Sequence, residues 1–271
     1  MEENQKIVRT AIVVLIVLVA CVGVYYLFIA DRGKSPASTE PLPTEKIGRA
    51  EKEAEGPGGG AGINVPLDQS DEIVRKSAAD LSANAVFGQW LKSGGLVRRF
   101  VAAVDAIANG QSPRPQADFF ALKKPFPILS KNGRTLLDPA GYDRYNIVAD
   151  VFDSVSAAAC AKLYRDFQGP LEQAYRELGY PAGGFHKTLF RAILEVLRTP
   201  IVDAPLVLEQ RVASYVYADP RLEELSAAQK HLLRMGPENL QLIQSKLREL
   251  ALAWGFAETQ LPKARGQAPV N

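Results

Sequence analysis

Cysteine and histidine are scarce in this chain, with two residues of each type among 271. Cys21 lies in a long apolar run and Cys160 far beyond it, so the two thiols cannot form a disulfide. We expect Cys160, in an alanine-rich stretch, to be a small buried hydrophobic residue rather than a reactive thiol. Neither His186 nor His231 has a further ligand at metal-binding spacing, so the sequence predicts no metal site.

The sequence also lacks a strong net charge and the common catalytic motifs. The formal charge is +2, which gives no field that would favour nucleic acid as a partner. There is no Gly-x-Ser-x-Gly nucleophile elbow, no phosphate-binding loop and no dinucleotide-binding glycine motif after a strand. The glycine-rich residues 56–62 have no accompanying lysine or strand, and we interpret them as linker. No catalytic residue and no cofactor is predicted.

A long uncharged apolar run is present, by contrast, from Thr10 to Ala30. At about 1.5 Å per residue, roughly 21 helical residues just cross a hydrocarbon core of about 30 Å. We expect an uncleaved transmembrane helix, because the run is longer than the apolar region of a signal peptide. Leu18-Val-Ala-Cys21 resembles a bacterial lipobox, which leaves lipoprotein processing at Cys21 as an alternative. The residues after Cys21 stay apolar, which favours the anchor.

The orientation of this anchor rests on a small charge difference. Lys6 and Arg9 precede it in a short tail, residues 1–9, and Arg32 and Lys34 follow it. Since a short tail ahead of a single span commonly stays in the cytoplasm, we expect an inner-membrane protein whose C-terminal domain faces the periplasm. The bilayer is then a partner through residues 10–30.

Two segments have the composition of disordered chain. Residues 31–65 are rich in proline, glycine, serine and glutamate, and they cannot bury enough apolar area to fold. As a flexible coil of about 35 residues, this linker reaches roughly 30 Å. Residues 257–271 form a second such tail. The domain between them, residues 66–256, is long enough for one hydrophobic core.

The domain is predicted to be mainly α-helical, because apolar residues recur at three- and four-residue spacing between helix start and stop signals. Residues 184–198 are apolar on nearly all sides, which predicts a central, buried helix. Helix starts are predicted at Ser70, Asp138-Pro139, Ser156, Asp219-Pro220, the capping box Ser226-x-x-Gln229 and Gly236-Pro237. The expected helices cover residues 70–82, 95–108, 139–152, 156–178 with a kink at Gly169-Pro170, 184–198 and 237–254.

One β-element is predicted. Asn132-Gly133 stands between two short apolar runs and suits a type I′ turn, so we expect a small β-hairpin near residues 126–137. The expected fold class is therefore a single-span transmembrane helix, a disordered linker and a compact, mainly α domain with this one hairpin.

Four stretches of the domain have a distinctive sequence: Leu96–Asp105, Asp143-Arg-Tyr145, Leu178-Gly-Tyr-Pro181 and the long stretch Ala218–Asn239. Together they resemble the bacterial family called domain of unknown function 3014. The resemblance extends over about residues 66–253, and the family's layout of anchor and linker is similar. It implies a bacterial envelope location and a single domain, but it supplies no catalytic residue, because the family has no assigned activity.

Basic side chains in those stretches are the candidate ligand or partner contacts. If several converge, they could hold a carboxylate or a phosphate through bidentate hydrogen bonds. The alternative is an internal network in which Asp105 and Asp143 neutralise the arginines. The candidates, with their aromatic and polar neighbours, are Arg98, Arg99, Arg144, Tyr145, Gln229, Lys230 and Arg234.

The remaining candidates for reactive side chains are carboxylates and His186. Pairs such as Glu172/Glu177 and Glu223/Glu224 could serve acid–base hydrolysis of envelope glycans, but solvated helix faces explain them more simply. His186 stands at a helix start, where the positive end of the dipole favours the neutral imidazole.

We therefore expect a non-enzymatic envelope interaction or assembly module whose partner is an unidentified envelope protein or wall component. Tethering raises the local concentration, so a weak surface suffices. The alternatives from other classes are a cell-wall-modifying hydrolase that uses carboxylates in a cleft, and a binder of a small anionic ligand that uses the arginine cluster.

Overall fold

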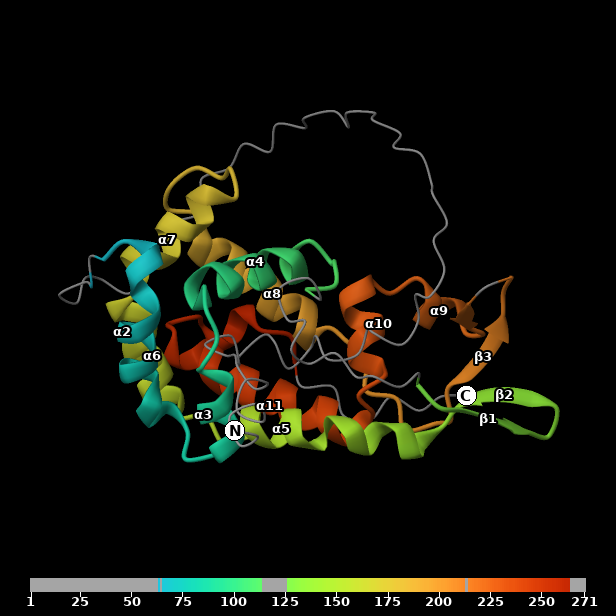
Figure 1. The fold of residues 1–271 in the computed structure, drawn as a ribbon. Helices are drawn as coiled ribbons and strands as arrows, with labels where there is room; N and C mark the ends of the chain where they lie inside the picture. The colour runs from blue at the N-terminus through green and yellow to red at the C-terminus, as the bar shows by residue number, and fades with distance from the viewer. Residues whose placement is uncertain (1–62, 64, 114–125, 213, 264–271) are drawn as a thin grey trace, which may run out of the picture.

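The computed structural model describes residues 63, 65–113, 126–212 and 214–263 (Figure 1). The predicted cytoplasmic tail, the anchor and nearly all of the linker lie outside these residues, as does most of the predicted C-terminal tail. Within the described ranges, no helix combines the length and the apolar character that crossing a membrane requires.

The described chain is mainly helical and contains one small antiparallel sheet, in agreement with the predicted fold class of the domain. The α-helices are α2 (Ser70–Ala78), α3 (Ala85–Trp90), α4 (Leu96–Ala108), α5 (Asn146–Asp153), α6 (Ala157–Asp166), α7 (Gln168–Glu177), α8 (Phe185–Leu197), α9 (Pro220–Glu223), α10 (Ala227–Leu233) and α11 (Pro237–Ala253). The strands are β1 (Ile128–Lys131), β2 (Arg134–Leu137), β3 (Val207–Gln210) and β4 (Tyr215–Tyr217). Short 3-10 helices are η3 (Leu67–Gln69), η4 (Ala79–Leu81), η7 (Pro139–Tyr145) and η8 (Glu258–Gln260).

Helix α8 lies in the core, as its all-round apolar sequence predicts. It packs against α4 along its length and also contacts α7, α10 and α11. Leu189 and Ile193 are fully buried, and Phe185 meets Phe100 of α4 edge-on with ring centroids 5.9 Å apart. Because burying each large apolar side chain contributes roughly 1.5–3 kcal/mol, α8 is a rigid support for the segment that follows it.

The predicted hairpin is confirmed, and it is part of a larger sheet. Asn132 and Gly133 have φ angles of 52° and 71°, as the type I′ turn requires. The sheet has the order β1-β2-β3-β4 with antiparallel neighbours. Leu137, Leu208 and Tyr217 share the face that packs on the core, and all three are buried. The opposite face therefore carries Arg134 and Val207.

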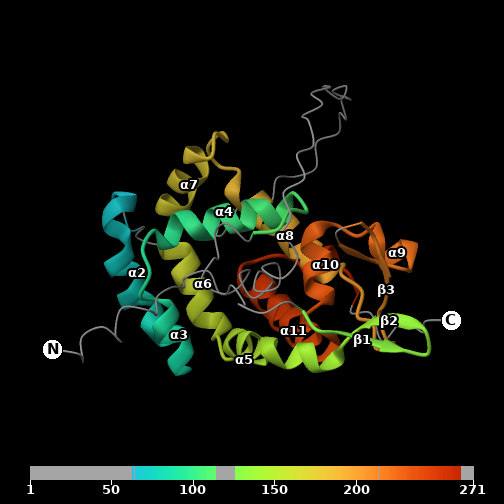
Figure 2. The ribbon, with the colours of Figure 1, turned by 45° about the vertical axis from the view of Figure 1, so that its right-hand side comes forward.

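The sheet and the helices form a molecule with two distinct ends. The strands and α9 lie at one end, and α2, α3 and α7 lie at the other, in both views (Figures 1 and 2). Helices α8, α10 and α11 occupy the middle. Residues 198–206 connect α8 to β3, so they run from the core toward the end that carries the sheet.

Three helix predictions need correction. The chain after Asp138 begins as the 3-10 helix η7 and becomes α-helical only at Asn146, although Asp138 does accept the predicted capping bond from Ala140 N at 3.0 Å. The predicted helix 156–178 is two helices, because the chain breaks at Phe167, ahead of the expected kink. Pro170 lies in the first turn of α7, where a backbone N–H has no partner within the helix, so the proline loses no hydrogen bond. Ser70 starts α2 but donates to Leu67 O instead of capping the helix.

The domain also extends further than predicted at its C-terminal end. Residues 258–260 form the 3-10 helix η8, and Leu261 is buried with the core. The boundary predicted at residue 256 is therefore too early, because a leucine after the helical pattern supplies one more apolar anchor.

Candidate functional site

The predicted basic cluster does not form one site. Arg98 projects from α4 and forms ion pairs with Glu177 of α7 and Asp68 of η3, with shortest N–O distances of 2.5 Å and 2.6 Å. Hydrogen bonds from Arg98 lower the pKa of the Glu177 carboxyl. Arg99, the next residue in the chain, is half-buried and is also engaged in a non-covalent contact. Arg98 thus links three elements at the end of the molecule away from the sheet.

Arg144, Tyr145 and Arg234 do lie together, around buried aromatic rings. Tyr145 is buried, and burial raises its pKa, while the neighbouring cations Arg144 and Arg234 act in the opposite direction. The guanidinium of Arg144 lies 5.6 Å from the Phe126 ring centre and that of Arg234 lies 6.0 Å from the centre of Tyr217. Cation–π packing of this kind stabilises the junction of η7, β4 and α10.

Gln229 and Lys230 have structural contacts. Gln229 completes the predicted capping box with Ser226 and also donates to Glu195 O at 3.2 Å. Lys230 pairs with Glu223 at 2.5 Å. Burial opposes ionisation of Glu223, but hydrogen bonds from Lys230 and from the Tyr217 amide outweigh it, so the pKa of this carboxyl is lowered.

Asp105 and Asp143 are not the acidic partners of Arg98 and Lys230. Asp105 accepts a hydrogen bond from Asn109 at 3.0 Å, and Asp143 has no ion pair within the described residues. The carboxylates that pair with Arg98 and Lys230 are Glu177, Asp68 and Glu223. Sequence spacing did not identify them because each lies on a different element from its cation or beyond helical spacing.

Other arginines surround a hollow of about 610 Å³ at the end of the molecule that carries the sheet and α9. We call it the arginine groove. Its walls come from β2, from the segment after α8, from the start of β3 and from α9. Its charged residues are Arg134, Arg198, Arg221 and Asp219, and its apolar lining includes Ile201, Val202, Leu206, Val207, Leu222 and Leu225.

Local structure explains why these arginines reach the groove. Arg134 follows the Asn-Gly turn on the sheet face opposite the core. Arg198 ends α8, and Pro200 stops the helix from continuing. Both are exposed, and neither has an ion-pair partner in the described part of the chain. Arg221 is different, because Asp219 holds it with N–O distances of 3.1 Å and 2.8 Å while also capping α9.

A second hollow of about 340 Å³, the acidic pocket, adjoins the arginine groove. Val202, Ala204 and Pro205 line both. The acidic pocket has no basic lining residue, and its carboxylates are Asp143, Asp203 and Glu238. Among the residues that the structure describes, no group of three histidine, cysteine or carboxylate side chains is placed to bind a metal ion.

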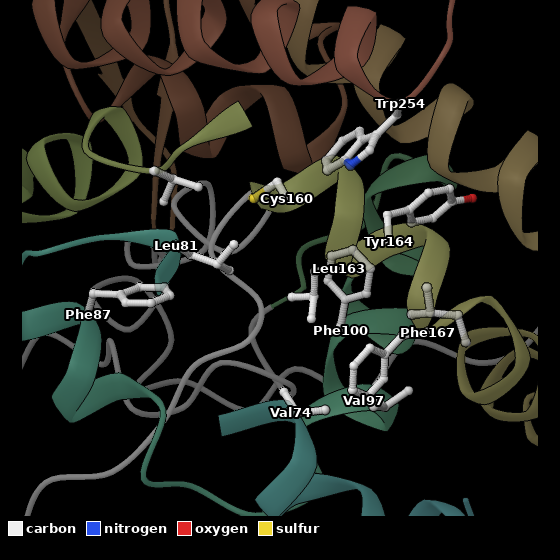
Figure 3. A pocket seen from close by; sticks show the side chains of 12 residues that line it. Val74, Leu81, Phe87, Val97, Phe100, Cys160, Leu163, Tyr164, Phe167 and Trp254 are labelled. Carbon is white, nitrogen blue, oxygen red and sulfur yellow. The ribbon is translucent and has the colours of Figure 1, made fainter. Parts of the chain in front are cut away.

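A third hollow is an apolar cavity of about 60 Å³ between α2, α4, α6 and α7 (Figure 3). Cys160, Phe100 and Trp254 are among its lining residues. Since one water occupies about 30 Å³, the cavity has room for only a very small guest. Burial raises the pKa of the Cys160 thiol to about 12, so Cys160 is the buried hydrophobic residue that the sequence predicts.

His186 lies outside both charged hollows. Its ring stacks on Phe256 with centroids 4.4 Å apart, and its Nδ1 lies 2.9 Å from the hydroxyl oxygen of Tyr164. Burial lowers the pKa of His186 and favours the neutral ring predicted from its place in the sequence. Glu172 caps the same helix start by accepting from the Phe185 amide at 3.0 Å.

The residues of the arginine groove could not be recognised as a group from the sequence, because they come from distant parts of the chain. Arg134, Arg198 and Arg221 are more than twenty residues apart and belong to a strand, a helix end and a short helix. One local signal was available: the apolar segment Ile201–Val202 lies between Pro200 and Pro205, which is unusual for a solvated loop. None of Arg98, Arg144 and Arg234 lines any of the three hollows.

Comparison with known families gives one match. A family model described as "Protein of unknown function (DUF3014)" matches residues 96–251, more than half of the chain and a span that contains every residue named for the groove and the acidic pocket. Neither the comparison with curated proteins nor the one with solved structures gave a match.

Proposed function

The chain belongs to the DUF3014 family, and we propose that it is a non-enzymatic interaction or assembly module of the bacterial envelope. In this proposal residues 10–30 hold it in the inner membrane and the domain described above lies in the periplasm. The linker gives the domain a reach of roughly 30 Å, so its surface meets membrane and wall components at a high effective concentration.

The arginine groove is the observation that carries this proposal. Arg134 and Arg198 present guanidinium groups that no carboxylate of the described residues neutralises, next to an apolar lining. Guanidinium groups bind carboxylates through paired hydrogen bonds, and the apolar lining adds a non-directional contribution. The groove therefore suits a partner surface that has both carboxylates and apolar side chains.

The same groove has little that could perform catalysis. Its lining contains no histidine, cysteine or serine, and its one carboxylate, Asp219, is occupied by Arg221 and by the start of α9. General acid–base or nucleophilic catalysis needs a proton-transfer group that is free to act. Binding without reaction is the function that this composition supports.

In-cell photo-crosslinking tests the proposal. A photoreactive residue is placed at Arg198, at Leu222 or, as a matched control at the opposite end of the molecule, at exposed Lys76 of α2. We expect the two groove positions to capture the same envelope partner and Lys76 to capture none. Failure of both groove positions to capture any species, with the protein present and folded, would contradict the proposal. Alkaline phosphatase fused after residue 263 tests the periplasmic location separately, since it is active only outside the cytoplasm.

The acidic pocket supports a second candidate, a wall-modifying hydrolase. Asp143, Asp203 and Glu238 lie around one hollow without a basic residue, and two suitably spaced carboxylates are sufficient for glycoside hydrolysis. If this is the function, the purified protein releases soluble fragments from wall glycan, and Asp143→Asn or Asp203→Asn abolishes the release. Absence of fragments from the wild-type protein favours the interaction module.

A further inference from the structure

The arginine groove and the acidic pocket are two sides of one surface. Val202, Ala204 and Pro205 line both hollows, so the segment 202–205 forms the wall between them. Val202 and Ala204 are only partly buried, and Pro205 is exposed. A strip of apolar side chains thus separates a positively charged hollow from a negatively charged one.

The charges on the two sides are available for an external partner. Arg134 and Arg198 on the positive side have no ion-pair partner in the described part of the chain, and neither have Asp143, Asp203 and Glu238 on the negative side. All five residues are exposed. Within this surface Val202, Ala204 and Pro205 lie between the two sets, and among the described residues no ion pair joins them.

A surface of this kind is complementary to itself. A twofold rotation about an axis through the 202–205 segment places the positive side of one copy opposite the negative side of the other, and the reverse contact forms at the same time. A partner of one charge could satisfy only half of the surface, whereas a second copy satisfies both halves and covers the apolar strip. The net charge of +2 gives little long-range repulsion between copies.

We infer that the partner of this surface is a second copy of this chain, in a symmetric dimer in which Arg134 and Arg198 face Asp143 and Asp203 of the other copy. The inference rests on the proposed interaction function and names its partner. The contact resembles other charge-complementary interfaces, in which opposite charges fix the orientation and apolar contact adds stability. Tethering two copies in one membrane favours even a weak dimer.

Charge reversal of each side separately, and then of both in a mixture, tests the inference. The positive side is reversed by Arg134→Glu with Arg198→Glu, and the negative side by Asp143→Lys with Asp203→Lys. Full-length copies with two different affinity tags are mixed in a mild non-ionic detergent, and capture of one copy by the other is measured. The control Lys76→Glu with Lys92→Glu changes the charge by the same amount as the first variant, at exposed positions on and near α2 and α3.

We expect the wild-type protein and the control to pair, and each reversed variant alone to pair about tenfold or more weakly, because like charges then face each other. A mixture of the two reversed variants restores pairing, since Glu of one copy then faces Lys of the other and the second, unchanged contact is also complementary. A contact that does not place the positive side of one copy on the negative side of another does not predict that rescue. Circular dichroism establishes that each variant is folded.

Two results would overturn the inference. One is a wild-type protein that does not pair, and the other is a pair of folded variants whose mixture stays unpaired. In either case the crosslinking experiment separates the two proposals. Capture of a different envelope protein at Arg198 or Leu222 would leave the proposed function in place with another partner, and capture of nothing would remove both.

Discussion

At the scale of single residues, the charged side chains divide into those with a structural partner and those without. Arg98 is held by Glu177 and Asp68, and Lys230 by Glu223. Arg134 and Arg198 are exposed and unpaired within the described residues. Exposed ion pairs contribute little to stability, so the paired group mainly fixes how elements sit against one another. The unpaired group has no such role within the described residues, and the proposed recognition function rests on it.

The buried thiol of Cys160 leads to a reactivity prediction. Its exposed fraction is 6%, and burial raises its pKa to about 12, so almost no thiolate forms at pH 8. In a full-length Cys21→Ser protein, we expect Cys160 to resist a thiol reagent such as dithionitrobenzoate until denaturant is added. The denatured sample is the control and reacts completely. Reaction of the native protein at the rate of a free thiol would contradict this placement.

The same residue, together with Tyr142, makes stability depend on alkaline pH. Burial raises the pKa of Cys160 from 9.0 and that of Tyr142 from 10.0 to about 12 in each case. The folded protein keeps these protons at a pH where the unfolded chain releases them. The free energy of unfolding is therefore fully retained below about pH 9 and falls as the pH rises toward 12, by about 1.4 kcal/mol per pH unit for each proton.

Urea unfolding between pH 8 and 11 measures this slope. In Cys160→Ala the slope becomes shallower above pH 9, because one of the titrating groups is gone. The comparison is of slopes, so the loss of stability from the smaller side chain does not affect it. An unchanged slope in Cys160→Ala would show that this thiol does not titrate differently in the two states.

At the scale of elements, local capping chemistry was enough to place most helices. Ser156, Asp219 and the Ser226-Gln229 box act as predicted, because each cap bonds to a backbone N–H two or three residues away. The Asn132-Gly133 turn was equally predictable, because asparagine and glycine tolerate the positive φ angles that both residues adopt. These signals act within four residues, so one sequence contains all the information they need.

Elements that depend on distant contacts were not predictable in the same way. Strands β3 and β4 have four and three residues, and β3 exists because it pairs with β2, about seventy residues earlier. The arginine groove depends on that pairing, since β3 brings Val207 and the 198–206 segment next to Arg134. The break at Phe167 likewise reflects packing of α6 and α7 on different neighbours.

Gly236, at the start of α11, gives a prediction with a matched control at the other end of the helix. Its φ is +86°, and a Cβ there would lie 2.6 Å from Cγ of Tyr142. Gly255 has a similar φ of +94° and open space around its Cβ position. We expect Gly236→Ala to lower the free energy of unfolding by about 1–3 kcal/mol more than Gly255→Ala, because of the clash with Tyr142 and because the ψ of 160° at Gly236 adds backbone strain. Urea denaturation of both variants measures it, and equal losses would mean that Tyr142 moves aside freely.

At the scale of the whole molecule, opposite charges are segregated around the 202–205 segment although the net charge is small. The domain end with α2, α3 and α7 contains the ion pairs of Arg98, while the end with the sheet has unpaired cations and anions side by side within the described residues. A membrane-tethered protein with such an end would find a second copy by diffusion in two dimensions. Pairing of the two copies would then depend more on how well their opposite charges match than on a high intrinsic affinity.

Ionic strength distinguishes this charge-based dimer from one held by apolar contact. The Debye length falls from about 10 Å at 0.1 M salt to about 3 Å at 1 M, so exposed Arg134 and Asp143 would attract each other far less at high salt. We expect the dissociation constant of full-length copies to rise about tenfold or more between low and high sodium chloride. The mixed pair of charge-reversed variants should show the same dependence, because its charges are exchanged and not removed. A dimer held by its apolar strip alone would be unaffected or strengthened in sodium sulfate, since that salt favours apolar burial. A dissociation constant that stays constant across the salt range would therefore assign the contact to Val202, Ala204 and Pro205 and not to the charges on either side of them.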